Sequence, residues 1–413
     1  MADGSTTHHD ILVSGGGVAG LTAACAFGSA GFSVLCVDPA PPVTEAAADG
    51  ADLRSTAFLQ PSRAVLEAAG LWDRLAPHAA DLQVMRIVEA GGDPPEARSV
   101  RDFDAADISD LPFGWNLPNW LLRREMVARI AELPNVAFRP GVATARLFTR
   151  ETEAIARLSD GTRCRARLVV AADGRNSPVR EAAGIGVQTM RYGQKALAFT
   201  VTHPIPHQNV STEIHLSGGP FTLVPLPDLD GRPHSAVVWM EEGPRALDLA
   251  QMDRAALEAE MSARSCYHFG PLSLASQITV WPIISQIADR LDGERVALIA
   301  EAAHVVPPIG AQGLNMSLAD MGCLLELARA RPEGLGDAEM LRAYHRRRWA
   351  DIRLRVTGID ALNRASMAGA PALAALRDRA MRLLHDVRPV RRTLMQAGLG
   401  ARPARTADGA PAP

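Results

Sequence analysis

The stretch DILVSGGGVAGL at residues 10–21 decides the fold of this chain. Its apolar start at 11–13 is typical of a buried parallel strand, and residues 18–30 predict a helix rich in Ala. A second apolar run, 33–37, ends at Asp38. A strand, a helix and a second strand of these lengths predict a βαβ unit that binds a dinucleotide.

The glycines of this turn have different tasks. Gly15 permits the tight turn, Gly17 lets the backbone approach a pyrophosphate, and Gly20 allows the helix to pack closely on the strand. The pyrophosphate is expected at the helix N-terminus, where free N–H groups and the helix dipole favour an anion. Asp38 is placed to accept hydrogen bonds from an adenosine ribose. Its charge disfavours a 2′-phosphate, so the site suits FAD or NAD better than NADP.

A second stretch, AEAAHVVPPIGAQGLN, occupies residues 300–315 and follows a buried strand at 295–299. Glu301 can accept hydrogen bonds from ribityl hydroxyls, and the two prolines stiffen the loop. Gly310 and Gly313 let the backbone lie against a flat ring. The helix that begins here directs free N–H groups at the negative pyrimidine edge of a reduced flavin. This pairing of motifs narrows the dinucleotide to FAD.

Three other residues are candidates with two interpretations each. Asp173 and Gly174 follow a buried strand at 167–171, where a carboxylate can serve a bound dinucleotide, although an Asp-Gly turn is also common. His304 is either a general base or a histidine that holds the loop. Arg54 is either a solvated surface residue or a side chain that reaches the cofactor.

The composition excludes several classes of protein. The chain has 413 residues, which suits about two or three domains, with 47% hydrophobic and 22% charged residues. A formal net charge of −3 argues against a nucleic-acid binder. The five cysteines show no CxxC and no metal-ligand spacing, which predicts buried thiols in a reducing compartment and no metal site. A polar N-terminus and the lack of a long apolar run predict a cytoplasmic protein without signal peptide or membrane-spanning helix.

The order of the elements predicts an α/β fold. Strands that begin at residues 11, 33, 168 and 296 serve one parallel sheet, and an antiparallel sheet around 195–238 is inserted between them. Ser62 is expected to cap a helix over 62–69. The predicted parts are a Rossmann-like FAD-binding domain (1–75, 118–185 and 281–345), a substrate domain (76–117 and 186–280), C-terminal helices (346–400) and a disordered tail (401–413).

The motifs, in this order and at these separations, resemble the group A flavoprotein aromatic hydroxylases, whose best-known member is para-hydroxybenzoate hydroxylase. The chain is more similar to the UbiH/UbiF-like ubiquinone-biosynthesis hydroxylases over roughly residues 10–365, and PIGAQGLN resembles their hallmark. It differs in Ala300-Glu301, where the family usually has Gly-Asp, and in Asp38, where the family often has Glu. Both changes keep the acid.

The resemblance implies roles for individual residues. The implied cofactor-binding set is Gly15, Gly17, Val18, Ala19, Gly20 and Asp38 for ADP; Arg54 and Arg123 near the flavin; Asp173 with Gly174 for FAD and NAD(P)H; Glu301 for the ribityl chain; and Pro308, Gly310, Gly313, Leu314 and Asn315 around the isoalloxazine, the last two through backbone N–H groups.

The resemblance also implies the chemistry. NAD(P)H reduces FAD, O₂ adds to the flavin, and a C4a-hydroperoxide transfers one oxygen to an electron-rich ring, here a prenylated phenol in ubiquinone biosynthesis. A substrate-side base is not identified by the sequence. Two alternatives stay open: a flavin hydroxylase or epoxidase of another small hydrophobic compound, and a non-catalytic flavoprotein that scaffolds a biosynthetic complex.

The C-terminal stretch 373–399 places six arginines among Leu, Met and Val. It predicts either a basic amphipathic surface for the inner face of a membrane or a Ubi complex, or a packed helix with its arginines outward. A monomer and a homodimer are both compatible with the sequence.

Overall fold

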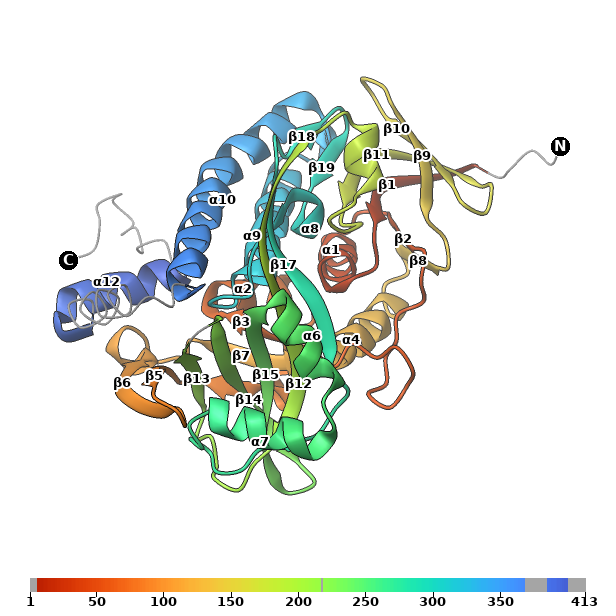
Figure 1. Ribbon diagram of the computed structural model, residues 1–413. Helices are drawn as coiled ribbons and strands as arrows, with labels where there is room; N and C mark the ends of the chain where they lie inside the picture. The colour runs from red at the N-terminus through yellow and green to blue at the C-terminus, as the bar shows by residue number, and fades with distance from the viewer. Residues whose placement is uncertain (1–5, 217, 368–384, 400–413) are drawn as a thin grey trace.

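The computed structural model describes residues 6–216, 218–367 and 385–399 (Figure 1). An eight-stranded sheet, sheet A, has the order β18-β19-β11-β1-β2-β8, with β10 and β9 continuing from β11. Its strands are β1 (Thr6–Ser14), β2 (Val34–Asp38), β8 (Val136–Pro140), β9 (Thr144–Thr149), β10 (Ala154–Leu158), β11 (Arg163–Ala171), β18 (Asp292–Gly293) and β19 (Val296–Leu298). The pairs β1–β2, β1–β11, β11–β19 and β2–β8 are parallel.

The parallel sheet predicted from the apolar runs is therefore confirmed. β1 ends in four fully or almost fully buried residues, and β19 is buried throughout, as expected of strands covered on both faces. Helix α1 (Val18–Ser29) consists mostly of small residues and is buried from Gly20 to Gly28. It packs against α4 (Asn119–Ala131) and α9 (Gln312–Ala330), so small side chains permit close neighbours.

A nine-stranded sheet, sheet C, has the order β20-β17-β12-β15-β14-β13-β5-β6, and β16 pairs with β12. Its strands are β5 (Val84–Gly91), β6 (Glu96–Asp104), β12 (Val187–Thr202), β13 (Val210–His215), β14 (Pro220–Leu229), β15 (Arg232–Glu242), β16 (Ser273–Leu274), β17 (Thr279–Ala288) and β20 (His304–Val305). All its pairs are antiparallel except β13–β5. Figure 1 shows β12 and β17 as long strands that reach from this sheet toward sheet A.

Sheet C has two different faces. One face carries a hydrophobic core that includes Leu197, Phe221 and Trp239, covered by α6 (Gly243–Gln251) and α7 (Arg254–Arg264). The other, here called the inner face, carries Ala196 and Met240. Alternation of side chains along each strand keeps these two sets apart.

A small third sheet, β3 (Ser55–Leu59), β7 (Gly114–Pro118) and β4 (Ala80–Leu82), joins the two large ones, with α2 (Gln60–Ala68), α3 (Trp72–Leu75) and the 3₁₀ turns η1 (Ala76–His78) and η2 (Ala105–Asp107) beside it in sequence. The expected cap at Ser62 is wrong: α2 begins at Gln60 with Pro61 in its first turn, so Ser62 lies inside the helix. Its hydroxyl instead donates to Asn315 Oδ1 at 2.6 Å.

Three of the expected domain boundaries fall inside helices or strands: 117/118 lies in β7, 280/281 in β17 and 345/346 in α10 (Ala338–Met367). The boundary expected between residues 280 and 281 falls inside β17, whose ten residues belong to sheet C. Pro282 lies just after this expected boundary, yet the strand continues through it, so the proline does not mark a passage between two parts.

The remaining described elements are helical or short: α5 (Pro178–Ala182), α8 (Ala300–Ala303), η3 (Pro332–Gly334), α10 (Ala338–Met367) and α12 (Arg388–Leu399). The predicted tail at 401–413 and the first half of the basic stretch, through residue 384, lie outside the described residues. None of the helices in the described ranges is long and apolar enough to cross a bilayer.

Candidate functional site

The parallel strands of sheet A deliver the predicted residues to one edge. Ser14 is the last paired residue of β1 and lies beside Val37 and Ala171, and Ala171 lies beside Leu298. The segments that follow these strands therefore begin side by side. They contain Gly15, Asp38, Asp173 and Glu301. Gly15 and Glu301 lie 286 positions apart in the sequence.

The glycine turn, residues 15–20, has the geometry that close packing requires. Gly15 has φ +111°, and a Cβ there would lie 2.3 Å from the carbonyl oxygen of Ala172. A Cβ at Gly20 would lie 1.9 Å from the carbonyl oxygen of Gly15. A Cβ at Gly17, in contrast, would meet no atom within 4 Å. The packing of the protein therefore requires glycine at positions 15 and 20, whereas Gly17 leaves open space at the start of α1.

That open space suits an anion. Gly17 is the N-cap of α1, no described side chain caps this end, and the first turn holds no acidic residue. The first N–H groups of the helix belong to Val18 and Ala19, which are half-buried. Asp38 flanks the turn, because its Oδ2 accepts from Gly16 N at 2.5 Å and its Oδ1 accepts from Ala40 N at 2.8 Å. These residues fit the ADP half of a dinucleotide.

Asp173 presents an unsatisfied polar atom at the same edge. Its Oδ2 accepts from Val179 N at 3.1 Å, whereas its Oδ1 is buried without a partner among the described residues. Burial raises the pKa of this carboxyl, although hydrogen bonds from Ser177 and Val179 oppose the shift. Gly174 beside it has φ +86°, and a Cβ there would meet no atom within 4 Å. The carboxylate oxygen is therefore available to a hydroxyl or amide donor.

Arg54 and Arg123 meet at a residue that the sequence did not indicate, Asp52. Arg54 Nε and Nη2 each donate to this carboxylate at 2.7 Å, Asn119 Nδ2 donates at 3.0 Å, and Arg123 Nη2 donates at 3.3 Å. Burial alone would raise the pKa of Asp52, but these hydrogen bonds and positive charges outweigh it and the pKa is lowered. We call Asp52, Arg54, Asn119 and Arg123 the Asp52 cluster.

The Asp52 cluster lies between the two large sheets. The Arg54 guanidinium carbon is 5.4 Å from the ring centroid of Trp281 on β17. The pKa of Arg54 is raised by its hydrogen bond to Asp52 and also by the charge of Glu301, which is itself exposed. Arg54 therefore stands between Glu301 of the FAD-side edge and Trp281 of sheet C.

The loop at 304–311, here called the proline loop, leads into α9 with two left-handed residues. Gly310 has φ +61° and Ala311 has φ +56°. No described side chain caps α9, and Gly313 in its first turn would place a Cβ 4.0 Å from its nearest neighbour, Val306. Pro308 is exposed and Leu314 is half-buried. An open helix start beside an exposed proline provides a surface against which a flat ring can lie.

Asn315 has a second task that the sequence did not reveal. Its Oδ1 accepts from Leu59 N at 2.8 Å and from the Ser62 hydroxyl, and its Nδ2 donates to the carbonyls of Ala57 at 2.7 Å and Ala311 at 2.6 Å. The side chain is buried and fully hydrogen-bonded, so it joins α9 to β3 and α2. Only its backbone N–H remains for the role that the resemblance implies.

His304 lies in a buried ion-pair chain. Its Nε2 is 2.7 Å from Asp320 Oδ2, and Arg348 Nε donates to Asp320 Oδ1 at 2.7 Å. His304 is 2% exposed and Asp320 is fully buried. This placement corresponds to the interpretation in which the histidine holds the loop, because its carboxylate partner is already neutralised by an arginine.

The inner face of sheet C meets the proline loop. Ala196, Met240 and Ile283 form a small buried apolar cluster, and Ile309 of the loop packs against it together with Trp281 and Tyr192. This cluster places apolar and aromatic side chains beside the surface on which a flavin ring can lie.

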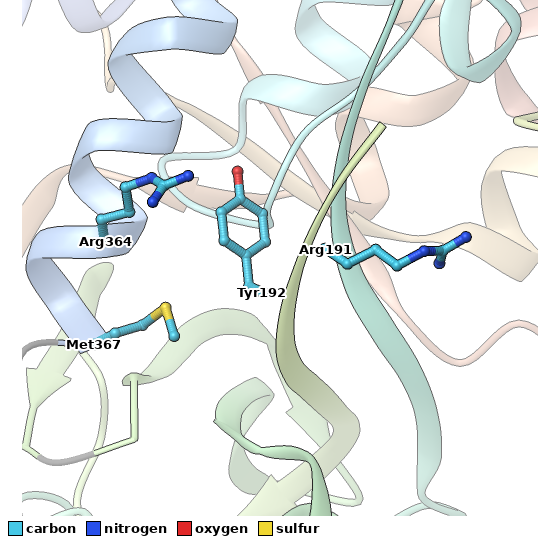
Figure 2. Close-up of a pocket in the computed structure, with 4 residues that line it drawn as sticks. All are labelled: Arg191, Tyr192, Arg364 and Met367. Atoms are coloured by element: carbon cyan, nitrogen blue, oxygen red, sulfur yellow. The ribbon is translucent and has the colours of Figure 1, made fainter. Parts of the chain in front are cut away.

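Figure 2 shows a neighbouring pocket of about 310 Å³, lined by Arg191, Tyr192, Arg364 and Met367.

The pocket contains a protonated tyrosine. In Figure 2, Tyr192, Arg364 and Met367 point toward one another, whereas Arg191 points away. The Tyr192 hydroxyl donates to Asp360 at 2.6 Å. Burial and this carboxylate raise the pKa of Tyr192 to about 12. Near neutral pH the tyrosine is a hydrogen-bond donor and not a base.

Comparisons with known proteins agree with this architecture. The model of the FAD binding domain family matches residues 8–356. The ubiquinone hydroxylase UbiL of Rhodospirillum rubrum is 33% identical over 95% of this chain and 89% of its own length, and the 3-demethoxyubiquinol 3-hydroxylase of Escherichia coli is 26% identical over 95% and 98%. The crystal structure of p-nitrophenol 4-monooxygenase PnpA from Pseudomonas putida DLL-E4 superposes with a TM-score of 0.77 at 20% identity, covering 97% of this chain and all of that one, which shows a shared fold.

Proposed function

The chain belongs to the FAD binding domain family and is a FAD-dependent monooxygenase, and on this premise we propose that it hydroxylates a prenylated phenol in ubiquinone biosynthesis. The substrate assignment is supported by the relatives, two of which are named as hydroxylases of ubiquinone or of its precursor. NAD(P)H is the reductant and O₂ the oxygen donor, as is typical of such enzymes.

The observation that carries the proposal is the apolar cluster of Ala196, Met240 and Ile283 against the proline loop. An aromatic ring bound on this inner face would lie beside Ile309, next to the open start of α9. Apolar surroundings exclude water from the reacting ring, which protects reduced oxygen species from hydrolytic loss. The adjoining pocket beside Tyr192 offers further room for an apolar chain on the substrate.

The proposed cofactor contacts follow from the site. The glycine turn and Asp38 would bind the ADP half, Asp173 Oδ1 would accept from a cofactor hydroxyl, and Glu301 would hold the ribityl chain. The Asp52 cluster would keep Arg54 beside the flavin, and the first N–H groups of α9 would face its pyrimidine edge. FAD supplies the activation of O₂; the side chains bind, orient and exclude water.

We further propose that α12 contacts an anionic membrane surface. Val390 and Leu394 of α12 are 39% and 41% exposed and lie four positions apart, which brings them to one side of the helix, and Val387, directly before the helix, is 39% exposed. Arg388 and Arg392 are also exposed and follow this stripe. Apolar side chains flanked by arginines favour the interface of an anionic bilayer. Long-chain quinone precursors reside in such membranes, so this contact would bring the site to its substrate.

A direct experiment tests the activity. The purified protein is examined for flavin absorbance, and NAD(P)H oxidation is followed with and without a prenylated phenol, with mass spectrometry of the product. We expect bound flavin, oxidation stimulated by the phenol, and a product heavier by one oxygen atom from ¹⁸O₂. Bound flavin without a hydroxylated product would refute the substrate assignment, and a protein that binds no FAD would refute the whole proposal.

A further inference from the structure

Two polar residues on the inner face of sheet C are placed for proton transfer, Glu213 and His215 on β13. Paired residues lead across the sheet from Trp281 to Ala196 and Met240. In β14, Thr222 pairs with Val238 and with Glu213, and Pro220 pairs with His215. Aligned residues of neighbouring strands point to the same face, so Glu213 and His215 share the face that packs against Ile309.

The position of Ile214 on the opposite side of β13 supports the assignment of Glu213 and His215 to the inner face. Ile214 lies between them in sequence and is fully buried in the core with Phe221 and Trp239. Because side chains alternate, Glu213 and His215 must point away from that core. They are nevertheless only 8% and 9% exposed, so the inner face buries two ionisable groups.

The pair has a defined proton arrangement. His215 Nε2 lies 2.8 Å from Glu213 Oε1, and His215 Nδ1 is buried with no hydrogen-bond partner among the described residues. A carboxylate can only accept, so Nε2 carries a proton, and in the neutral form of the ring Nδ1 carries a free lone pair. A histidine oriented by a carboxylate, with its other nitrogen free, is the arrangement of a general base.

Other charged groups surround the pair. Glu89 is the direct neighbour of His215 on β5, and Arg101 on β6 stands in the row of Glu213 through Ile87; both are buried. Phe103, also on β6, contacts the His385 ring, with 5.4 Å between the ring centroids.

Helix α12 connects the turn after β6 with the start of α9. Arg391 is paired with Asp107, His385 Nε2 lies 3.1 Å from the carbonyl oxygen of Asp102, and the carbonyl of Gly398 at the far end accepts from Gln312 Nε2 at 3.1 Å. Among the described residues, Arg391 of α12 and His385 before it therefore have partners on β6 and on the turn that follows it.

His304 resembles His215 but differs in one respect. It too places Nε2 on a carboxylate, Asp320, and has a buried Nδ1 without a partner among the described residues. Asp320, however, also accepts from Arg348, so less of its charge is available to stabilise an imidazolium. His304 also lies in β20 at the start of the proline loop, whereas His215 lies on the face proposed for the substrate ring.

We propose that His215 is the base that deprotonates the phenolic substrate, an inference that rests on the proposed hydroxylase function. The phenol O–H bond breaks, the proton forms an N–H bond at His215 Nδ1, and the electron pair remains on the oxygen as a phenolate. Glu213 stabilises the imidazolium. The ring of the phenolate is more electron-rich than that of the phenol, so it reacts more readily with the oxygen that the flavin, NAD(P)H and O₂ supply. The proton returns from His215 when the hydroxylated product is protonated.

The test compares His215→Asn and Glu213→Gln with Ser211→Ala, a substitution on the same strand and face. For His215→Asn we expect hydroxylation of a prenylated phenol at pH 7 to fall about 100-fold, the lower range for general base catalysis. FAD content should stay at the wild-type value, and the slow NAD(P)H oxidation without phenol should be unchanged in Ser211→Ala. The deficit should shrink as the pH approaches about 10, where a phenol ionises in solution. Glu213→Gln, which preserves size, should give a smaller loss, and Ser211→Ala should behave as wild type.

A phenol that is already ionised separates this role from a structural one. With a nitro-substituted prenylated phenol, ionised at pH 7, the ratio of wild-type to His215→Asn rates should return to near one. An equal loss with both phenols, or no loss with either, would overturn the assignment of the base. A wild-type enzyme that hydroxylates neither phenol would overturn the proposed function itself, a result distinguishable because it needs no variant.

Discussion

Gly17 and Gly20 stand three positions apart and have opposite surroundings. A methyl group at Gly20 would overlap the carbonyl of Gly15, whereas a methyl group at Gly17 would meet no atom of the protein. The backbone at Gly17, with φ −69° and ψ 177°, is one that alanine adopts freely. Glycine at position 17 therefore leaves room for a ligand, whereas glycine at position 20 is required by the fold.

This difference predicts separable effects of two alanine substitutions. Gly17→Ala should leave the melting temperature of the apoprotein unchanged and weaken FAD binding at least tenfold, because the new methyl occupies the space above the helix start. Gly20→Ala should lower the melting temperature, since α1 must move away from Gly15. Thermal unfolding of the apoprotein and a fluorescence titration with FAD measure both effects. Equal FAD affinity in Gly17→Ala and wild type would contradict the cofactor placement.

Asp173 offers a prediction in which stability and affinity move in opposite directions. Burial raises the pKa of its carboxyl in the folded protein, so its contribution to stability is present at low pH and is lost as pH rises through that raised value. Asp173→Asn removes the buried charge, and at pH 7 the apoprotein should be at least as stable as wild type. FAD affinity should fall about tenfold, because a charge-assisted hydrogen bond is lost.

The exposed residue Asp81 provides the control for that experiment. Asp81→Asn should change neither unfolding nor FAD binding, because its carboxyl group is solvated. If Asp173→Asn were clearly less stable than wild type at pH 7 and bound FAD normally, Asp173 would be a structural residue of the turn before α5.

At the scale of elements, α9 is held by one amide side chain. Asn315 makes four hydrogen bonds to β3, to α2 and to the start of its own helix. The open N-terminus of α9 is thus positioned by contacts made one turn further along. The same side chain fixes the helix in the orientation that the proposed flavin contact requires.

Asn315→Ala should therefore destabilise the protein. It leaves Leu59 N–H and the Ala57 carbonyl without their partner in a half-buried location, at about 1–3 kcal/mol for each group. On the same basis we expect a loss of about 3 kcal/mol in the free energy of unfolding, measured with urea, and weaker FAD retention. Gln251→Ala, at the end of helix α6, should change neither. An unaltered urea midpoint for Asn315→Ala would show that α9 does not depend on this side chain.

The sequence predicted the individual helices and strands better than the contacts between them. Apolar runs with β-branched residues identified the strands of sheet A, and glycine spacing identified the turn, because both signals are local. The Asp52 cluster was missed because Asp52 and Arg123 lie 71 positions apart and meet only through folding. The alternation in β13 separates Glu213 and His215 from Ile214, but which side of the sheet faces the cofactor depends on the whole molecule.

At the scale of the molecule, sheet C reaches the proline loop through β20, and α12 connects the turn after β6 with α9. β17 pairs with β20 at the start of the proline loop and with β12 in sheet C. Helix α12 contacts the turn after β6 through Arg391 and contacts Gln312 of α9 through the carbonyl of Gly398. A single helix thus contacts both parts and carries the exposed apolar stripe on its outer side.

The membrane proposal is tested on that helix. The double variant Arg388→Glu and Arg392→Glu should bind vesicles of anionic phospholipid about tenfold or more weakly, because each basic residue near an anionic surface contributes about 1 kcal/mol. Binding to neutral vesicles and activity toward a water-soluble phenol should be unchanged. Cosedimentation with vesicles is the measurement, and Arg254→Glu on α7 is the control. Equal sedimentation of the double variant and wild type would remove α12 from the contact.

The alternation in sheet C also bears on how such a protein diversifies. Neighbouring codons in β13 to β15 specify, in turn, a residue of the hydrophobic core and a residue of the face proposed for the substrate. Evolution can therefore alter substrate preference one codon at a time while the adjacent codon preserves folding. The same sheet offers a laboratory library its design: randomising the inner-face codons alone should yield many folded proteins with divergent specificities.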